Sequence, residues 1–284
     1  MDSRFRETSA GTVATIESFA AGPAAPLVHF AHATGMCAAL YRPLFELLAP
    51  HVNIVAIDSR GHGATRLPAD PTAMTSWATY ADDLGALLAV VPVPPVLILA
   101  GHSMGATVSM ELAATMPGTV RAVVLAEPAF VPFASAANWN TKRPGANPMA
   151  DQAIRRRAVW PSREGIRAAY DGRGVFATWP DGALDDYLDG GLRDRDDGQV
   201  ELACAPAWEA ATFAAVSPRL EAAVTGWRGG LAMLHGTERS TVHAADAAAI
   251  AALPGAKITR FDGVDHFLPL HRPVELADAI LAFA

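Results

Sequence analysis

The chain has 284 residues, 51% of them hydrophobic, which is enough to bury one large domain or a core domain that carries an insertion. Its formal net charge of −7, without any basic run, argues against nucleic acid as a partner. No apolar stretch reaches the roughly 18 unbroken residues that a membrane span requires, so no span is expected.

The sequence carries no sign of secretion, metal binding or a bound cofactor. The segment Met1–Glu7 lacks the apolar core of a signal peptide. Cys37 and Cys204 are expected to be free thiols of a reducing compartment, although one bridge between them also fits the sequence. No Cys-x-x-Cys pair, His-Glu-x-x-His motif or carboxylate cluster with metal-site spacing occurs. We therefore expect a cytoplasmic protein whose partner is a small molecule, with neither a metal nor an organic cofactor.

Apolar runs alternate with helical segments along the first 129 residues. Strand signals are weak near residues 12–16 and stronger in four later runs, at 27–31, 52–57, 96–100 and 120–126. Helices are expected between them, at 39–48, 76–90 and 104–116. Strands that alternate with helices predict a parallel sheet, and right-handed crossovers place the carboxyl ends of its strands at one edge.

The alternation fails between residues 130 and 228. This stretch is polar, charged and interrupted by Gly and Pro, with helical patches at 149–159, 163–170 and 207–215. The core pattern resumes with a strand at 231–235, a helix at 243–253, a strand at 256–261 and a helix at 273–283. The sequence therefore predicts an α/β core made of residues 1–129 and 229–284, with a helical cap of residues 130–228 inserted into it.

The segment 96–106 reads as a buried strand, a sharp turn and the start of a helix. Gly101 and Gly105 flank Ser103 there, and such a turn leaves no room for side chains at the flanking positions. The turn lifts the Ser103 hydroxyl over the helix N-terminus, where N–H groups and the helix dipole favour an oxyanion. The segment resembles the nucleophile elbow of the α/β-hydrolase superfamily. The turn at 58–63, Asp-Ser-Arg-Gly-His-Gly, is similar to another motif of that superfamily.

The resemblance implies an α/β-hydrolase fold, a mostly parallel twisted sheet flanked by helices. It also implies that Ser103 is the nucleophile and that His266, between the last strand and the last helix, is its general base. The backbone N–H of Met104 would supply half of an oxyanion hole. The loop after the strand 27–31 would supply the other half, from Thr34 or else from Ala33.

The carboxylate partner of His266 has several candidates. The superfamily usually carries it after the strand 231–235, but Arg239 stands where the common pattern has Asp, with Glu238 one position before it. Some branches carry the acid after the preceding core strand, where this chain has Glu127. A carboxylate at a strand end loses hydration and needs a partner such as an imidazole N–H. We favour Glu127, with Glu238 as the alternative acid and Asp246 and Asp265 as further candidates.

The expected cap is rich in aromatic residues, which either form its own core or line a pocket above Ser103. The candidates for contact with a substrate are Ala33, Phe130, Trp139, Trp160 and Trp179. The run of arginines at 155–157 forms either a solvated helix face or a site for a substrate carboxylate.

The expected activity is that of a serine esterase with a Ser103, His266 and Glu127 triad. Its substrate would be a small, largely apolar carboxylic ester, lactone or thioester, cleaved through an acyl-enzyme. The same constellation serves C–C bond hydrolases and cofactor-free perhydrolases, so these remain open. A receptor-like protein that binds a small ligand and turns it over slowly is a further alternative.

Overall fold

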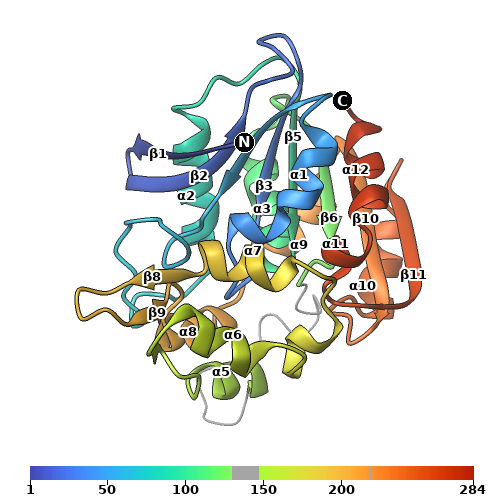
Figure 1. The fold of residues 1–284 in the computed structure, drawn as a ribbon. Helices are drawn as coiled ribbons and strands as arrows, with labels where there is room; N and C mark the ends of the chain where they lie inside the picture. The colour runs from blue at the N-terminus through green and yellow to red at the C-terminus, as the bar shows by residue number, and fades with distance from the viewer. Residues whose placement is uncertain (130–146, 218) are drawn as a thin grey trace.

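The fold is built around an eight-stranded sheet of order β1-β2-β4-β3-β5-β6-β10-β11 (Figure 1). The computed structural model describes residues 1–129, 147–217 and 219–284. The strands are β1 (Asp2–Thr8), β2 (Gly11–Ser18), β3 (Leu27–Ala31), β4 (Asn53–Ile57), β5 (Leu97–His102), β6 (Val120–Ala126), β10 (Gly230–Glu238) and β11 (Lys257–Asp265). Only the β1–β2 and β2–β4 pairs of this sheet are antiparallel. The predicted α/β fold with a mostly parallel sheet is confirmed.

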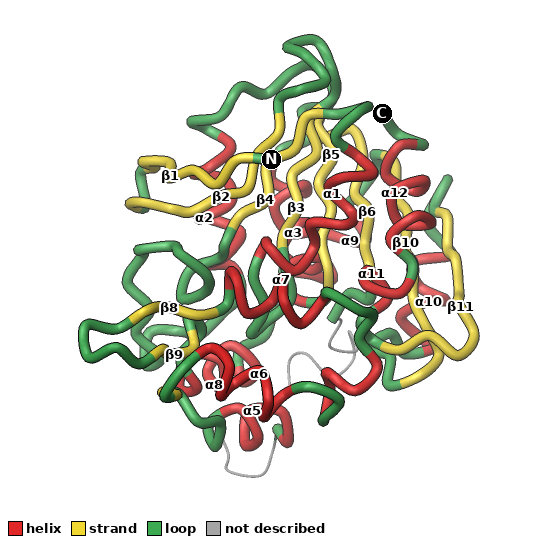
Figure 2. Tube along the Cα trace, in the orientation of Figure 1, coloured by secondary structure: helices red, strands yellow, loops and turns green. Residues whose placement is uncertain are grey.

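Helices cover both faces of this sheet (Figure 2). The helices α2 (Ala78–Leu88), α3 (Met104–Thr115), α9 (Leu220–Gly226) and α10 (Ala244–Ala251) contribute to the apolar cluster on one face. The helices α1 (Arg42–Leu48), α11 (Leu268–His271) and α12 (Pro273–Leu281), with the 3-10 helix η1 (Ala38–Tyr41), contribute to the other. Within β5, Leu97 and Leu99 join the first cluster, whereas Ile98 and Ala100 join the second. This alternation explains why a strand buried on both faces reads as a continuous apolar run.

The chain between β6 and α9 adds a second group of elements. It contains α5 (Pro148–Ala153), α6 (Arg163–Tyr170), η2 (Gly174–Thr178), α7 (Ala183–Gly190) and α8 (Pro206–Ala214). A small sheet of order β7-β9-β8 joins Val159–Trp160, Val200–Leu202 and Leu192–Asp194. These elements lie together in the lower part of Figure 1, beside the edge where β5 and β6 end. The helix expected at 149–159 ends at Ala153, and Val159–Trp160 pair with β9 instead. Pro161 disfavours helical backbone at Trp160, the residue before it.

The two cysteines are buried and unpaired, as the sequence predicted. Burial raises the pKa of both thiols, so Cys37 and Cys204 stay protonated at neutral pH. Within the described ranges no helix combines the length and apolar character that a membrane crossing needs.

Glu111 of α3 gives the fold a pH-dependent weakness. Glu111 is 2% exposed, and burial raises the pKa of its carboxyl from 4.5 to about 6. The positive charge of Arg219 lowers this pKa but does not outweigh the effect of burial. The folded chain therefore holds this proton more tightly than the unfolded chain, and stability is lost as pH rises from 4.5 to 6. Glu111→Gln should stabilise the protein by about 1–2 kcal/mol at pH 7.5. The gain in Tm should shrink at pH 5, and an equal gain at both pH values would contradict this origin.

Candidate active site

Ser103 occupies the turn between β5 and α3. Its backbone has φ 55° and ψ −119°, a conformation that L-residues rarely adopt. A Cβ atom on Gly101 would lie 2.5 Å from the carbonyl carbon of Gly105, and one on Gly105 would collide with the carbonyl oxygen of Ala31. Glycine is therefore required at both flanking positions, as the sharp turn predicted. The Ser103 hydroxyl bonds to no group in the described part of the chain, which leaves it free to rotate.

Glu127 and His266 meet at the carboxyl edge of the sheet. Glu127 follows β6 with φ 47° and is fully buried, and its Oε2 lies 3.2 Å from Nδ1 of His266. His266 comes from the loop between β11 and α11. A carboxylate can only accept, so this contact places the imidazole proton on Nδ1. Nε2 of His266 is then an acceptor, and it has no partner among the residues described.

The end of β10 and the loop after it supply further donors to Glu127. Oε1 accepts the N–H of Gly236 at 2.5 Å, while Oε2 accepts the Ser240 hydroxyl at 2.9 Å and the N–H of Thr241 at 3.1 Å. Burial alone would raise the pKa of Glu127. The contact with His266 and the bonds from Gly236 and Ser240 outweigh it, so the pKa lies below its usual 4.5. Glu127 is therefore ionised at neutral pH.

Sequence reasoning missed Gly236, Ser240 and Thr241. They lie in the segment where the common pattern carries its acid, and here they donate to the carboxylate of Glu127, which follows β6.

The other carboxylates proposed for His266 lie elsewhere. Glu238 is exposed at the end of β10, and Asp246 lies on α10. Asp265 precedes His266, but its oxygens accept from Arg239 at 3.0 Å and from the Thr178 hydroxyl at 2.7 Å. Within the described chain, none of these three carboxylates bonds to the ring of His266.

Two backbone N–H groups near Ser103 are unused. The N–H of Ala33 donates to the Tyr41 hydroxyl at 3.2 Å, and the N–H of Gly35 donates to Nε2 of His62 at 3.0 Å. The N–H of Thr34, between them, has no acceptor among the described residues, and neither has the N–H of Met104. Burial lowers the pKa of His62 well below 6.5, which keeps its Nε2 available as an acceptor.

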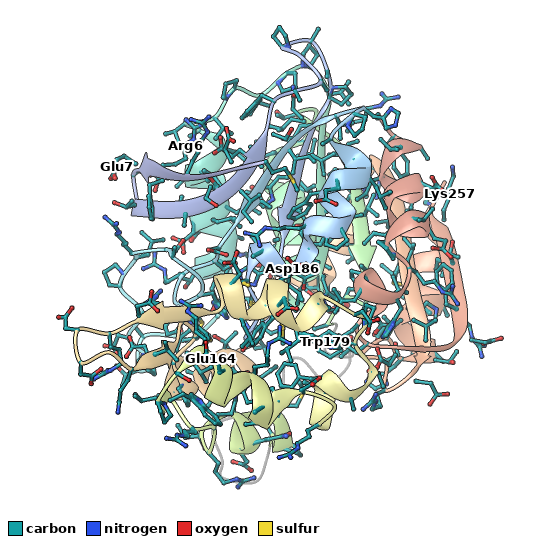
Figure 3. All side chains as sticks on the ribbon, in the orientation of Figure 1. Arg6, Glu7, Glu164, Trp179, Asp186 and Lys257 are labelled. Atoms are coloured by element: carbon teal, nitrogen blue, oxygen red, sulfur yellow. The ribbon has the colours of Figure 1, made fainter. Side chains whose placement is uncertain are left out.

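A cavity of about 500 Å³ opens above Ser103. Residues of the core and of the segment 147–217 line it: Ala33, Thr34, Met36, Ser103, Met149, Gln152, Ala153, Arg156, Arg157, Trp160, Tyr170, Gly174, Val175, Phe176, Glu209, Phe213, Arg239, Thr241, Asp265, His266 and Phe267. Two of the expected substrate contacts, Ala33 and Trp160, are therefore at the cavity. Trp179 (labelled in Figure 3) is not among its lining residues and packs edge-on against Phe267, with ring centroids 5.1 Å apart. Phe130 and Trp139 lie outside the described residues.

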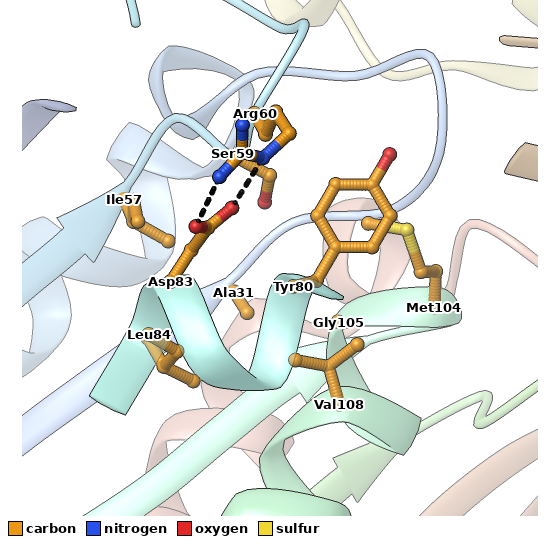
Figure 4. Close-up of a pocket in the computed structure, with 10 residues that line it drawn as sticks. All are labelled: Ala31, Ile57, Ser59, Arg60, Tyr80, Asp83, Leu84, Met104, Gly105 and Val108. Carbon is orange, nitrogen blue, oxygen red and sulfur yellow. Dashed lines mark hydrogen bonds and ion pairs between the residues drawn. The ribbon is translucent and has the colours of Figure 1, made fainter. Parts of the chain in front are cut away.

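A second, much smaller cavity of about 10 Å³ lies behind the elbow (Figure 4). Arg60 and Asp83 line this cavity and are joined by two hydrogen bonds of 2.6 and 2.8 Å. These bonds tie the turn at 58–63 to α2, which is a structural role. This space suits a single water molecule and no substrate. In the ranges 1–129, 147–217 and 219–284, no group of three or more His, Cys, Asp or Glu side chains is arranged to hold a metal.

Comparison with known proteins agrees with this architecture. A family model described as the alpha/beta hydrolase family matches residues 30–279. The chain is 34% identical over 108 residues to the 2-(acetamidomethylene)succinate hydrolase of Mesorhizobium japonicum, covering 38% of this chain and 37% of that protein. It is 30% identical over 107 residues to the (E)-2-((N-methylformamido)methylene)succinate hydrolase of Acinetobacter baylyi, covering 38% of this chain and 39% of that protein. The matches thus span well under half of these curated relatives.

A solved structure resembles the whole chain. The crystal structure of E-2-(acetamidomethylene)succinate hydrolase superposes with a TM-score of 0.77 at 25% identity, covering 99% of this chain and 98% of that one.

Proposed function

Since this chain belongs to the alpha/beta hydrolase family, we propose that it hydrolyses an acyl bond of a small substrate through an acyl-enzyme on Ser103. His266 would act as the general base and Glu127 as the acid of the triad. The observation that carries the proposal is the 3.2 Å contact between Glu127 and His266 at a cavity that Ser103 also lines. We further propose that residues 130–228 act as a cap, because residues 149–213 supply the far wall of that cavity.

The first half of the reaction forms the acyl-enzyme. Ser103 Oγ attacks the carbonyl carbon as its proton passes to Nε2 of His266, and Glu127 stabilises the imidazolium that results. The carbonyl oxygen becomes an oxyanion. The unused N–H groups of Thr34 and Met104 would bind it, which costs the enzyme no existing hydrogen bond. Collapse breaks the bond to the leaving group, and this group takes the proton from His266.

The second half frees the enzyme. His266 Nε2 accepts a proton from a water molecule, whose oxygen attacks the acyl carbon. The acyl bond to Ser103 breaks, Oγ regains its proton from His266, and the carboxylic acid leaves. Aromatic walls such as Trp160, Phe176 and Phe267 would limit the access of other water molecules.

The charges at the cavity favour a substrate that carries a carboxylate as well as an apolar part. Arg156 is paired with Glu209 at 2.5 Å and Arg239 with Asp265 at 3.0 Å. Arg157 contacts no carboxylate in the described chain. Its Nε donates to the carbonyl of Val159, and its guanidinium lies 4.6 Å above the ring of Trp160. The remaining N–H groups suit a carboxylate. Both curated relatives are named for substituted methylene succinates, which are carboxylates with an N-acyl group.

Arg157→Gln should raise KM for a carboxylate-bearing ester by about tenfold, the value of one charge-assisted hydrogen bond. KM for a neutral ester of equal length should stay within about twofold. Arg155→Gln is the matched control, because Arg155 is an exposed neighbour that does not line the cavity. If KM changes equally for both esters, or if both variants change KM equally, then Arg157 does not bind a substrate carboxylate.

The proposed activity is tested by mass spectrometry during turnover of a panel of substrates. The panel contains p-nitrophenyl esters, thioesters, lactones and N-acyl enamines, each with and without a carboxylate. We expect multiple turnover of at least one class and a transient mass gain of its acyl group on the Ser103 peptide. Labelling of Ser103 by a fluorophosphonate without turnover of any member would favour a binding protein instead.

A further inference from the structure

A buried row of hydrogen bonds links the three backbone segments that would carry the reaction. The N–H of Ala33 lies 3.2 Å from the Tyr41 hydroxyl, which lies 2.8 Å from Nδ1 of His102. Nε2 of His102 lies 2.7 Å from the carbonyl oxygen of His266. We propose that Tyr41 and His102 are positioning residues, which align the oxyanion loop, the nucleophile elbow and the loop of the general base. The proposal rests on the roles proposed above for Ser103 and His266.

Only one arrangement of protons satisfies every member of the row. The carbonyl of His266 can only accept, so His102 must carry a proton on Nε2. Burial lowers the pKa of His102 well below 6.5, so the ring is neutral and its Nδ1 is an acceptor. The Tyr41 hydroxyl therefore donates to Nδ1, and its oxygen accepts the N–H of Ala33. Each bond fixes the direction of the next.

The row determines which N–H group faces the reaction. Ala33 is occupied by Tyr41, and Gly35 is occupied by His62, so Thr34 alone of these three N–H groups is left for an oxyanion. At the other end of the row, Nε2 of His102 donates to the backbone carbonyl of His266, the proposed general base. His102 also directly precedes Ser103, so a shift of its ring would move the elbow and the base loop together.

The surroundings of the row are buried and closely packed. Tyr41 is 1% exposed and His102 is fully buried. The ring of Tyr41 packs on Phe30 at 4.8 Å between centroids, and the ring of His102 packs on Phe267 at 5.9 Å. Water has little access to replace a lost bond, so the loss of one hydroxyl should weaken the alignment of every segment that the row connects.

Tyr41→Phe tests the proposal because it removes the central hydroxyl and keeps the ring. We expect kcat to fall about tenfold or more with KM within about twofold, because an oxyanion develops only in the transition state. The rate of labelling by a fluorophosphonate should fall by a similar factor, since its phosphoryl oxygen would use the same N–H groups. This second measurement needs no knowledge of the natural substrate.

Tyr80→Phe is the matched control. Tyr80 is 3% exposed, and its hydroxyl bonds to Oγ1 of Thr212 at 2.8 Å, away from the row. Both variants remove one buried hydroxyl, but Tyr41→Phe loses two hydrogen bonds and Tyr80→Phe loses one. A purely structural role therefore predicts a larger loss of Tm in Tyr41→Phe, with similar kcat in the two variants. The proposal would be overturned if Tyr41→Phe folds and has the same kcat and the same labelling rate as Tyr80→Phe. His102→Gln, which can still donate toward the carbonyl of His266, should retain more activity than His102→Leu, and equal losses would count against the row.

Nitrogen-15 NMR of the histidine rings tests the bond directions directly. We expect a proton on Nε2 of His102 and none on Nδ1, and the reverse tautomer would overturn the proposal. If a fluorophosphonate fails to label the wild-type protein, the proposed function is wrong, whereas the NMR result still decides whether the row exists.

Discussion

Ser103→Ala should lower kcat by about 10⁵-fold or more, the loss seen when a serine hydrolase loses its nucleophile. The Ser103 hydroxyl makes no hydrogen bond within the described chain, so its removal should leave the stability of the fold nearly unchanged. The elbow geometry is set by Gly101 and Gly105, which remain. Substrate affinity should therefore persist while turnover is lost, as single-turnover kinetics and equilibrium binding of the same ester will show.

The control for this substitution is Ser109→Ala. Ser109 is a fully buried serine of the same helix, and its hydroxyl donates to the carbonyl of Ala100 at 3.2 Å. It should lower Tm slightly and leave kcat within about twofold. Turnover by Ser103→Ala within tenfold of wild type would rule out the acyl-enzyme, as would fluorophosphonate labelling of a different residue.

The elbow could be predicted because its constraints are local. A glycine two residues before and two residues after a serine, between a strand and a helix, is a requirement of backbone packing, and the collisions at Gly101 and Gly105 show why. The bounds of β3, β6 and α6 agree with expectation for a similar reason, since each is framed by Pro, Gly or a capping Ser within a few residues.

The surroundings of Glu127 could not be predicted, because they depend on segments far apart in the chain. Three groups that donate to this carboxylate, Gly236, Ser240 and Thr241, lie more than a hundred residues downstream. The choice between Thr34 and Ala33 likewise depends on Tyr41, whose hydroxyl occupies the N–H of Ala33. A sequence lists such donors, but only the packing of the loops shows which acceptor each one meets.

The segment 147–217 was hardest to predict for another reason. Its helices α6 and α8 lie within one residue of their expected bounds, whereas its small sheet was not expected. The strands β8 and β9 have three residues each, which is too short for an alternation to be read.

Glu127→Gln should lower kcat by about 10³- to 10⁴-fold, the loss expected when the triad acid can no longer fix the tautomer of its histidine. The amide oxygen of glutamine can still accept from the N–H of Gly236 or from Ser240, so the fold should be retained. Its NH₂ group cannot accept from His266 Nδ1, and no negative charge remains to stabilise the imidazolium. KM should change little, because Glu127 is fully buried and does not line the cavity.

Glu238→Gln is the control that separates the two acids. Glu238 is exposed and forms no hydrogen bond with His266 in the described chain, so kcat of this variant should stay within about twofold of wild type. The pKa of Glu127 lies below 4.5, so its charge persists throughout the neutral range and is lost only as pH falls through that lowered value. The charge that Glu127→Gln removes is therefore present in the wild-type protein at every pH between about 6 and 8. A large loss in Glu238→Gln with little in Glu127→Gln would assign the acid to the turn after β10, and the bonds from Gly236, Ser240 and Thr241 would then serve only to anchor a buried carboxylate.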